Sequence, residues 1–307
     1  MQHFPRAQPK CWARGVFVAA IPGVPVHPCC IGVPLFAPVS ALGARVHDAV
    51  GRFGLFVRFS GQALGAVIRS PRATLRWREL APLLLEVGTA SIPVVALTGL
   101  MVGLILSVEG YTQFAAIGAE RRMGGIINAN VVKQIGPVLA AVMVAGRVGG
   151  AIAAEIGAMR ISEQLDAMRA AGANPVARLV GPRVVACMVM TPVLTVYSDA
   201  LGAFGAWAVL TQVYSVPSTE YWHYTSLFLV TLDPLNGLLK AACFGGAIGL
   251  ISCYKGFSCA PGAAGVGRAA TSAFVASFVA IVAINLFLVE FMNALTVWIY
   301  GGLPRVL

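Results

Sequence analysis

Charged side chains are scarce in this 307-residue chain, at 11% of the sequence, whereas about a quarter of the residues in soluble domains are charged. Apolar residues make up 58%, and the mean hydropathy is +0.81. A soluble protein of this length could not cover its surface with only 34 charged side chains. The composition therefore excludes a soluble globular protein and predicts an integral membrane protein.

A phosphate-binding loop for ATP is also absent. Such a loop ends in a lysine followed by serine or threonine, and none of the four lysines is followed by either: Lys10, Lys133, Lys240 and Lys255. We therefore expect no cofactor in this chain, no ATPase activity of its own, and an energy source in another subunit or in an ion gradient.

Metal, disulfide and nucleic-acid signatures are missing as well. The seven cysteines show no paired CxxC spacing, which argues against a disulfide framework and a zinc site. No His-rich metal-ligand cluster or paired-carboxylate motif is present. Basic residues flank apolar runs and form no aromatic-studded patch, so nucleic acid is not an expected partner.

Five apolar segments are long enough to cross about 30 Å of hydrocarbon. We predict them at residues 82–108, 134–154, 184–213, 226–251 and 271–300. The predicted fold is an all-α integral membrane protein, with an N-terminal interfacial amphipathic helix and a five-helix domain over residues 79–307.

The segments before the first span differ from it in composition. Residues 1–44 contain seven prolines, which interrupt every apolar run, and are predicted to be a poorly ordered extension. Residues 45–78 carry apolar side chains at helical spacing with arginines between them. Such a basic amphipathic helix is expected to lie in the membrane interface on the cytoplasmic side.

The distribution of basic residues predicts the orientation. Of the 22 Lys and Arg residues, sixteen lie in segments on the side of the N-terminal region and four on the opposite side. Because cytoplasmic loops are enriched in Lys and Arg, the N-terminus is predicted in the cytoplasm and the C-terminus in the periplasm. The loop between the second and third spans is then cytoplasmic.

This central loop is the most charged part of the spanning region. Ser162 is suited to cap a helix whose first turn carries Glu163 and Asp166, where acidic side chains favour the helix dipole. Gly172 and the Asn-Pro pair after it are stop signals. A helix over about 162–172 is too short to span, and the residues alone allow either a helix lying on the headgroups or one that transmits force to both neighbouring spans.

Long motifs give a resemblance to a known family. The run GPVLAAVMVAGRVGGAIAAEIGAMRISEQLDAMRAAGANPVARLVGPRVVA resembles the MlaE family, the permeases of lipid-transporting ABC systems that work with MCE-domain proteins. TGLMVGLILSVEGY, DPLNGLLKAACFG, ISCYKGF and GVGRAATSAFVASFVAI recur in the same order with matching spacing. The resemblance extends from about Trp77 to Gly302.

The resemblance implies a homodimer seated on two ABC ATPase subunits, which would bind ATP and Mg. It implies transport of phospholipid or a related lipid between the inner membrane and a periplasmic MCE-domain protein, and a small cytoplasmic STAS-domain subunit is a further candidate partner. The short central helix would be the coupling helix. The residues expected to contact the ATPase are Glu155, Glu163, Gln164, Asp166 and Met168.

Charged groups inside spans are costly unless paired or facing water, so each is a functional candidate. Lys240, in the fourth span, is predicted to bind a lipid phosphate in a cavity, or else to extend its ammonium to an interface. Lys133 and Gln134 are further candidates for lipid binding and stand where the second span is predicted to begin, at positions where the family usually carries Arg-Glu. Lysine keeps the charge but loses the guanidinium fork, and glutamine removes a titrating carboxylate.

Three residues near the outer end of the first span are candidates for contact with acyl chains. Leu106 and Phe114, with Gln113, are predicted to line an apolar cavity between two subunits, of the sort a lipid tail requires. Ordinary packing or lipid-facing positions are the alternative. Small-residue spacing also predicts close helix packing at Gly99 and Gly103, and at the 146/150 pair of the second span.

Two other functions are alternatives. Asp199 and Glu290 could be the coupling carboxylates of an ion-gradient-driven transporter, but the odd span number and the absence of an inverted repeat argue against it. We expect one of them to pair with Arg147 instead. A membrane-embedded lipid hydrolase would need a nucleophile beside a base, and the four histidines lie in the N-terminal region or an outer loop.

Overall fold

The computed structural model describes residues 37–69, 77–229 and 232–300, and its regular elements in these ranges are all helical. Residues 1–36, which hold most of the predicted N-terminal extension, lie outside the described residues. The chain divides into two compact units, Met1–Gly51 and Arg52–Leu307. The helices described below belong to the second unit, except that α1 begins in the first.

Five helical stretches in the described residues are long and apolar enough to cross a membrane, which confirms the predicted fold class. They are Trp77–Ala115 (α3), Glu120–Ile161, Val176–Gln212, Leu232–Phe257 (α10) and Ala263–Leu295, the last within α11 (Ala263–Tyr300). The fourth begins later than the predicted residue 226, because residues 226–228 belong to a separate helix, α9 (Ser218–Phe228).

The amphipathic segment forms α1 (Ala37–Arg69), which begins ahead of the predicted residue 45. Within the second unit its aromatic residues pack on the last turn of α10. Phe56 and Phe59 meet Tyr254 edge to face, with ring centroids 5.3 and 5.6 Å apart. The part of α1 that follows Gly51 is therefore anchored to the bundle by aromatic contacts.

The second span is a composite helix and is much longer than predicted. At 1.5 Å per residue its 42 residues cover roughly 60 Å, about twice the hydrocarbon thickness, so it extends beyond the membrane. Two short π-helical segments interrupt it. In order it consists of η1 (Glu120–Arg122), α4 (Met123–Asn130), η2 (Val131–Ile135), α5 (Gly136–Val144), η3 (Ala145–Gly149) and α6 (Gly150–Ile161).

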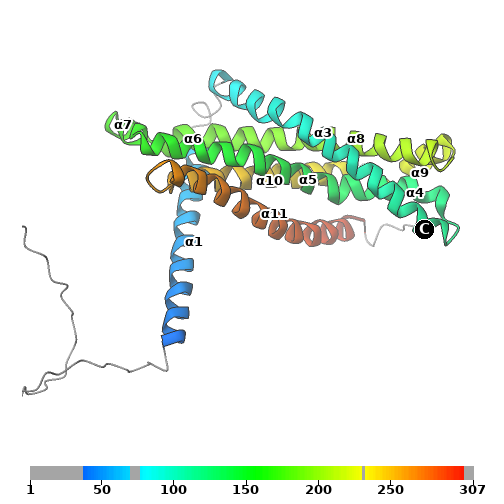
Figure 1. Cartoon of the computed structure of the whole chain (residues 1–307), viewed down its shortest axis with the longest axis horizontal. Helices are drawn as coiled ribbons and strands as arrows, with labels where there is room; N and C mark the ends of the chain where they lie inside the picture. Colours follow the sequence, from blue (N-terminus) through cyan, green and yellow to red (C-terminus); the bar gives the residue numbers. More distant parts are fainter. Residues whose placement is uncertain (1–36, 70–76, 230–231, 301–307) are drawn as a thin grey trace, which may run out of the picture. The chain divides into compact units, whose positions relative to one another are not determined.

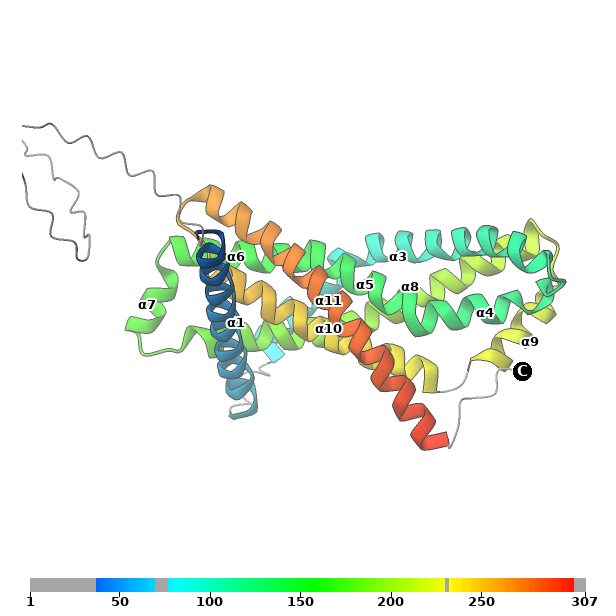
Figure 2. The ribbon, with the colours of Figure 1, turned by 90° about the horizontal axis from the view of Figure 1, so that it is seen from below.

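The bundle has two distinct ends. The short helix α7 (Gln164–Ala170) marks one end, and α9 lies at the other beside α4 (Figures 1 and 2). We call these the α7 end and the α9 end. At the α9 end the buried Tyr221 joins the two helices, since the Asn128 amide donates to its hydroxyl at 2.9 Å.

Glycines let α8 (Gly181–Gln212) approach α3 closely. A Cβ atom on Gly99 would lie 2.6 Å from the carbonyl oxygen of Ser198, and one on Gly103 would lie 2.0 Å from that of Gly202. Only hydrogen fits at such distances. The small-residue spacing of the first span is thus confirmed as a close helix contact.

The corresponding pair in the second span behaves differently. A Cβ atom on Gly146 would meet the Phe274 ring at 3.5 Å, and one on Gly150 would be 4.0 Å from the nearest backbone oxygen. These are ordinary van der Waals distances. The prediction of close backbone packing at Gly146 and Gly150 is therefore wrong for the described contacts, because the Phe274 side chain lies against Gly146 and the backbone beside Gly150 stays 4.0 Å away.

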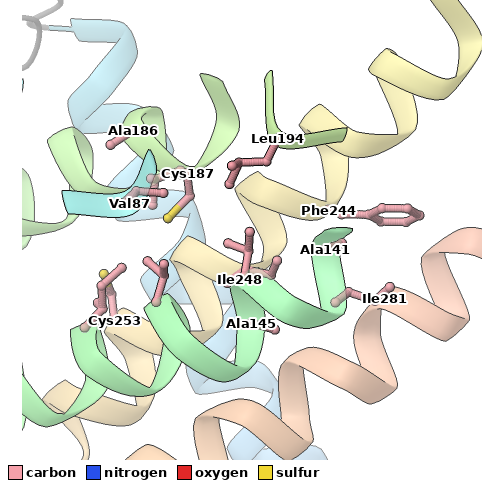
Figure 3. Packing of buried hydrophobic residues seen from close by; sticks show 14 of the residues in the cluster. Val87, Ala141, Ala145, Ala186, Cys187, Leu194, Phe244, Ile248, Cys253 and Ile281 are labelled. Carbon is pink, nitrogen blue, oxygen red and sulfur yellow. The ribbon is translucent and has the colours of Figure 1, made fainter. Parts of the chain in front are cut away.

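The main core joins α3, the second span, α8, α10 and α11 (Figure 3). Small and medium side chains predominate, which allows the helices to pack closely. The members labelled in the figure are Val87, Ala141, Ala145, Ala186, Cys187, Leu194, Phe244, Ile248, Cys253 and Ile281.

We predict that Gly103→Ala destabilises the fold by about 1–3 kcal/mol, because the added methyl group would overlap a backbone oxygen that cannot move aside easily. Gly246→Ala is the matched control: nothing lies within 4 Å of its Cβ position, and alanine favours a helix interior by up to about 1 kcal/mol. Thermal unfolding in detergent tests this. Equal midpoints for Gly103→Ala and the parent chain would contradict the assigned contact.

Candidate functional site

Lys240 lies buried on α10, with 5% of its surface exposed. Its ammonium donates to the side-chain oxygen of Gln134 and to the backbone oxygen of Lys133, both at 3.1 Å. The Lys133 ammonium in turn pairs with Asp233 at 3.0 Å. The structure thus brings together three of the predicted lipid-binding residues and adds Asp233, which sequence reasoning missed.

A π-helical segment presents this cluster to α10. Lys133 and Gln134 lie within η2, well inside the second span rather than at its beginning as predicted. The helix continues toward the α9 end through α4, from Asn130 back to Met123. The span therefore starts earlier than the residue 134 predicted from hydropathy. A π segment inserts a residue into the helical register, and such segments are frequent at functional sites.

The Lys240 ammonium retains binding capacity. It has three N–H donors, and the two oxygens that accept from it, on Gln134 and Lys133, are both uncharged. The positive charge of Lys240 is therefore not cancelled by a carboxylate in direct contact among the described residues. A phosphate group would supply both a charge and acceptor oxygens.

Arg147 does not form the ion pair that we predicted. Among the described residues it pairs with neither Asp199 nor Glu290. The Asp199 carboxylate lies elsewhere, against Gly136, where a Cβ atom would overlap it. Arg147 instead faces a cavity between α3, α6 and α8. The prediction failed for Asp199 because its carboxylate packs beside Gly136, eleven residues before Arg147 along the second span.

The three candidates near the outer end of the first span do not join the Lys240 cluster. Leu106 and Phe114 are half-buried and pack on a second core at the α9 end that includes Met123 and Tyr221. Gln113 is exposed. The first two therefore have packing roles within this chain, and their contact with acyl chains stays a prediction.

The predicted coupling helix exists as α7, but it begins differently. Ser162 does not cap it: its hydroxyl donates back to the Ala158 carbonyl oxygen at 2.9 Å and ends α6. Serine hydroxyls often bond back to the preceding turn in this way. Glu163 then turns the chain with a φ of 57°.

The predicted end of α7 is confirmed. Gly172 has a φ of 77°, and the N–H of Ala173 donates to the Met168 carbonyl oxygen at 3.0 Å. This is the arrangement in which a glycine terminates a helix. Asn174 then starts the third span, because its side chain accepts from the N–H of Val176 at 3.0 Å.

The surface of α7 is polar and accessible. Glu163, Gln164 and Asp166 are exposed, Met168 is half-buried, and Leu165 anchors the helix with only 3% of its surface exposed. Four of the five predicted coupling residues therefore share this end of the bundle.

The fifth predicted coupling residue, Glu155, lies apart from α7. It sits on α6, where its carboxylate pairs with the buried Arg183 of α8 at 2.6 Å. Glu155 thus links the second span to the third. Arg183 was not predicted, and no local pattern identified it, since the pair is formed across the bundle.

Five helices able to cross a membrane, a short polar helix at one end and a buried cationic cluster inside the bundle are the features of a polytopic membrane protein. The family model described as Permease MlaE matches residues 81–291. The chain therefore belongs to the MlaE permease family and is a multi-pass permease.

Relatives cover nearly the same region. A probable ABC transporter permease protein of Rickettsia felis is 38% identical over 82% of this chain and 96% of its own length. The intermembrane phospholipid transport system permease protein MlaE of Haemophilus influenzae is 30% identical over 83% of this chain and 97% of its own. The chloroplastic protein TRIGALACTOSYLDIACYLGLYCEROL 1 of Arabidopsis thaliana is 33% identical over 70% of this chain and 61% of its own length.

We predict that Gln134→Glu stabilises the protein by on the order of 1 kcal/mol, because a carboxylate would then neutralise the buried Lys240 ammonium. Gln113→Glu serves as the control, since this exposed residue is not part of the Lys240 cluster. The measurement is the unfolding midpoint of each variant in detergent. A lower midpoint for Gln134→Glu alone would show that Lys240 does not hold an unneutralised charge there.

Proposed function

We propose that this chain is the membrane subunit of a lipid ABC transporter in a bacterial inner membrane. It works as a homodimer, with an ABC ATPase at the α7 end and a periplasmic MCE-domain protein at the α9 end. The observation that carries the proposal is α7, an exposed polar helix held between two spans. The printed name of the Haemophilus relative, which specifies phospholipid transport, supports lipid as the cargo.

The connections of α7 suit it to transmit force. On one side Ser162 and Glu163 join it to α6 through a tight turn, and on the other Asn174 caps the start of the third span. Leu165 fixes it against the bundle. Movement of α7 by a bound ATPase would therefore displace both spans rather than bend a slack loop. ATP and Mg belong to the ATPase in this scheme.

The charge distribution supports the orientation. The α7 end carries the basic loops, which the positive-inside tendency places in the cytoplasm. The N-terminus is then cytoplasmic and the C-terminus periplasmic. A cytoplasmic STAS-domain subunit would bind on the same side as the ATPase.

Lipid binding inside the bundle is assigned to the Lys240 cluster. The ammonium of Lys240 has a donor to spare, and the neighbouring Lys133, although paired with Asp233, adds further N–H donors. Together they suit a lipid phosphate during its passage between the leaflet and the MCE-domain partner.

We predict that Glu163→Lys combined with Asp166→Lys abolishes ATP-driven lipid transfer, because the reversed charges would repel the ATPase surface that binds acidic α7 side chains. The double variant should fold normally, since both side chains are exposed. Glu109→Lys with Glu120→Lys, at the end away from the proposed ATPase site, is the control for ATPase copurification. Transfer between vesicles and copurification of the ATPase are measured together, and normal values of both in the α7 variant would refute the proposal.

We predict that Lys240→Met lowers bound phospholipid about tenfold, as expected for the loss of a charge-assisted hydrogen bond. Methionine preserves much of the side-chain volume, so the fold should persist. Native mass spectrometry of the purified chain measures the lipid retained. Lys255→Met, at the α7 end of α10, is the control, and equal occupancy in the two variants would remove Lys240 from the lipid path.

A further inference from the structure

A second polar site lies nearer the α7 end. A cavity of about 210 Å³, open to the surface on one side, is lined by α3, by η3 with α6, and by α8. Its wall carries four charged side chains: Glu86, Arg147, Glu155 and Arg183. Val87 and Ala186 form part of its apolar wall and belong to the core shown in Figure 3. The cavity shares no residue with the Lys240 cluster.

The charged groups of this cavity are only partly satisfied. Arg183, with 7% of its side chain exposed, donates to Glu155 at 2.6 Å and to the Leu179 carbonyl oxygen at 3.2 Å. Its Nε is buried and has no hydrogen-bond partner within the described part of the chain. Buried donors are normally paired, so this one marks a place for an acceptor that the chain itself does not supply.

Arg147 and Glu86 are exposed, unlike Arg183, and also have unused binding capacity. Neither forms an ion pair or a side-chain hydrogen bond with any residue in the three described ranges. Arg147 is carried by the π-helical segment η3, as Lys133 is carried by η2. A purely structural ion-pair network would be expected to use these groups on one another.

The charge balance of the cavity selects its ligand. Two guanidinium groups and two carboxylates give no net charge, so a simple anion would meet both Glu86 and Glu155. A zwitterion with a phosphate and an ammonium complements both signs. Guanidinium forks bind phosphate oxygens in a bidentate manner, and the carboxylate of Glu86 is available to accept from an ammonium.

Depth and size point to the headgroup of a membrane lipid. Glu155 and Arg147 precede the end of α6 at Ile161 by six and fourteen residues, or about 9 and 21 Å along the helix. Because the second span is about twice as long as the hydrocarbon is thick, these positions fall toward the leaflet at the α7 end. The cavity is smaller than the roughly 300–1,000 Å³ that encloses a whole drug-sized ligand, so lipid tails would remain outside it.

We propose that this cavity binds the zwitterionic phosphoethanolamine headgroup of a phospholipid from the leaflet at the α7 end. The phosphate lies on Arg147 and Arg183, and the ammonium lies on Glu86. This rests on the proposed function and deepens it, because it names the class of lipid and a binding position separate from Lys240.

Photocrosslinking of the full-length chain in lipid vesicles tests the site. The probes are phosphatidylethanolamine, phosphatidylglycerol and diacylglycerol, each with a photoreactive group near the glycerol, and labelled peptides are identified by mass spectrometry. Phosphatidylethanolamine should label peptides of α3 and α6 at the cavity at least about tenfold more than diacylglycerol does. Equal labelling by diacylglycerol or phosphatidylglycerol would overturn the headgroup assignment.

Variants separate recognition from folding. Arg147→Gln and Glu86→Gln should each reduce labelling by phosphatidylethanolamine about tenfold, and Arg147→Lys should restore it only in part, because lysine lacks the fork. Both residues lack partners in the described structure, so neither change should unfold the protein. Arg178→Gln, an exposed arginine outside the cavity, should label like the parent chain. Unchanged labelling in Arg147→Gln would refute the site.

Two further measurements are needed. One distinguishes a membrane lipid from a soluble ligand, and the other distinguishes failure of the cavity proposal from failure of the transporter proposal. Soluble glycerophosphoethanolamine should displace the lipid probe only in large excess, because it lacks tails that hold it in the membrane, and displacement at a concentration equal to that of the probe would overturn a membrane lipid as the ligand. ATP-driven lipid transfer is measured on the same samples reconstituted with the ATPase. Transfer without cavity labelling would refute the cavity alone, whereas cavity labelling without transfer would refute the transporter and leave the lipid site supported.

Discussion

The close contact between α3 and α8 is the constraint on which the other features depend. At Gly99 and Gly103 the two backbones touch with no room for a side chain. The position of α8 along the axis of α3 is therefore fixed. α8 places Arg183 near the α7 end and the Ala203 carbonyl, which accepts from the Tyr221 hydroxyl, at the α9 end. One contact between small residues therefore positions polar groups at both ends of the bundle.

Within that frame, the cost of charge in hydrocarbon decides where the remaining polar groups lie. Lys240 and Arg183 are both buried, and each reaches oxygens on a helix distant in sequence. They differ in what neutralises them. Arg183 has a carboxylate in direct contact, whereas Lys240 meets only uncharged oxygens. Because an unneutralised buried cation is expensive, Lys240 is the group with more to gain from a bound phosphate.

Sequence patterns predicted the features that depend on local chemistry. Hydropathy predicted the five spans, and Gly172 with its Asn-Pro successor predicted the end of α7, since a left-handed glycine and a proline act on their own neighbours. The Ser162 cap was wrong because two local bonds compete for that hydroxyl. Asp233 and Arg183 were not predicted because their partners are distant in sequence. Lys133 lies about 100 residues from Asp233, and Glu155 lies 28 residues from Arg183. Such pairings depend on how whole helices pack together.

In the proposed mechanism, Glu155 connects the movement of α7 with the cavity that contains Arg183. It lies six residues before the end of α6 and so moves with the turn that carries α7, yet its carboxylate also holds Arg183 in the cavity wall. A shift of α6 by an ångström or two along its axis would weaken a 2.6 Å ion pair strongly, because charge-assisted hydrogen bonds depend steeply on distance. Arg183 would then turn its whole guanidinium toward a ligand in the cavity. In the proposed mechanism, Glu155 would thereby couple the position of α7 to the affinity for a headgroup, without any contact between the ATPase and the lipid.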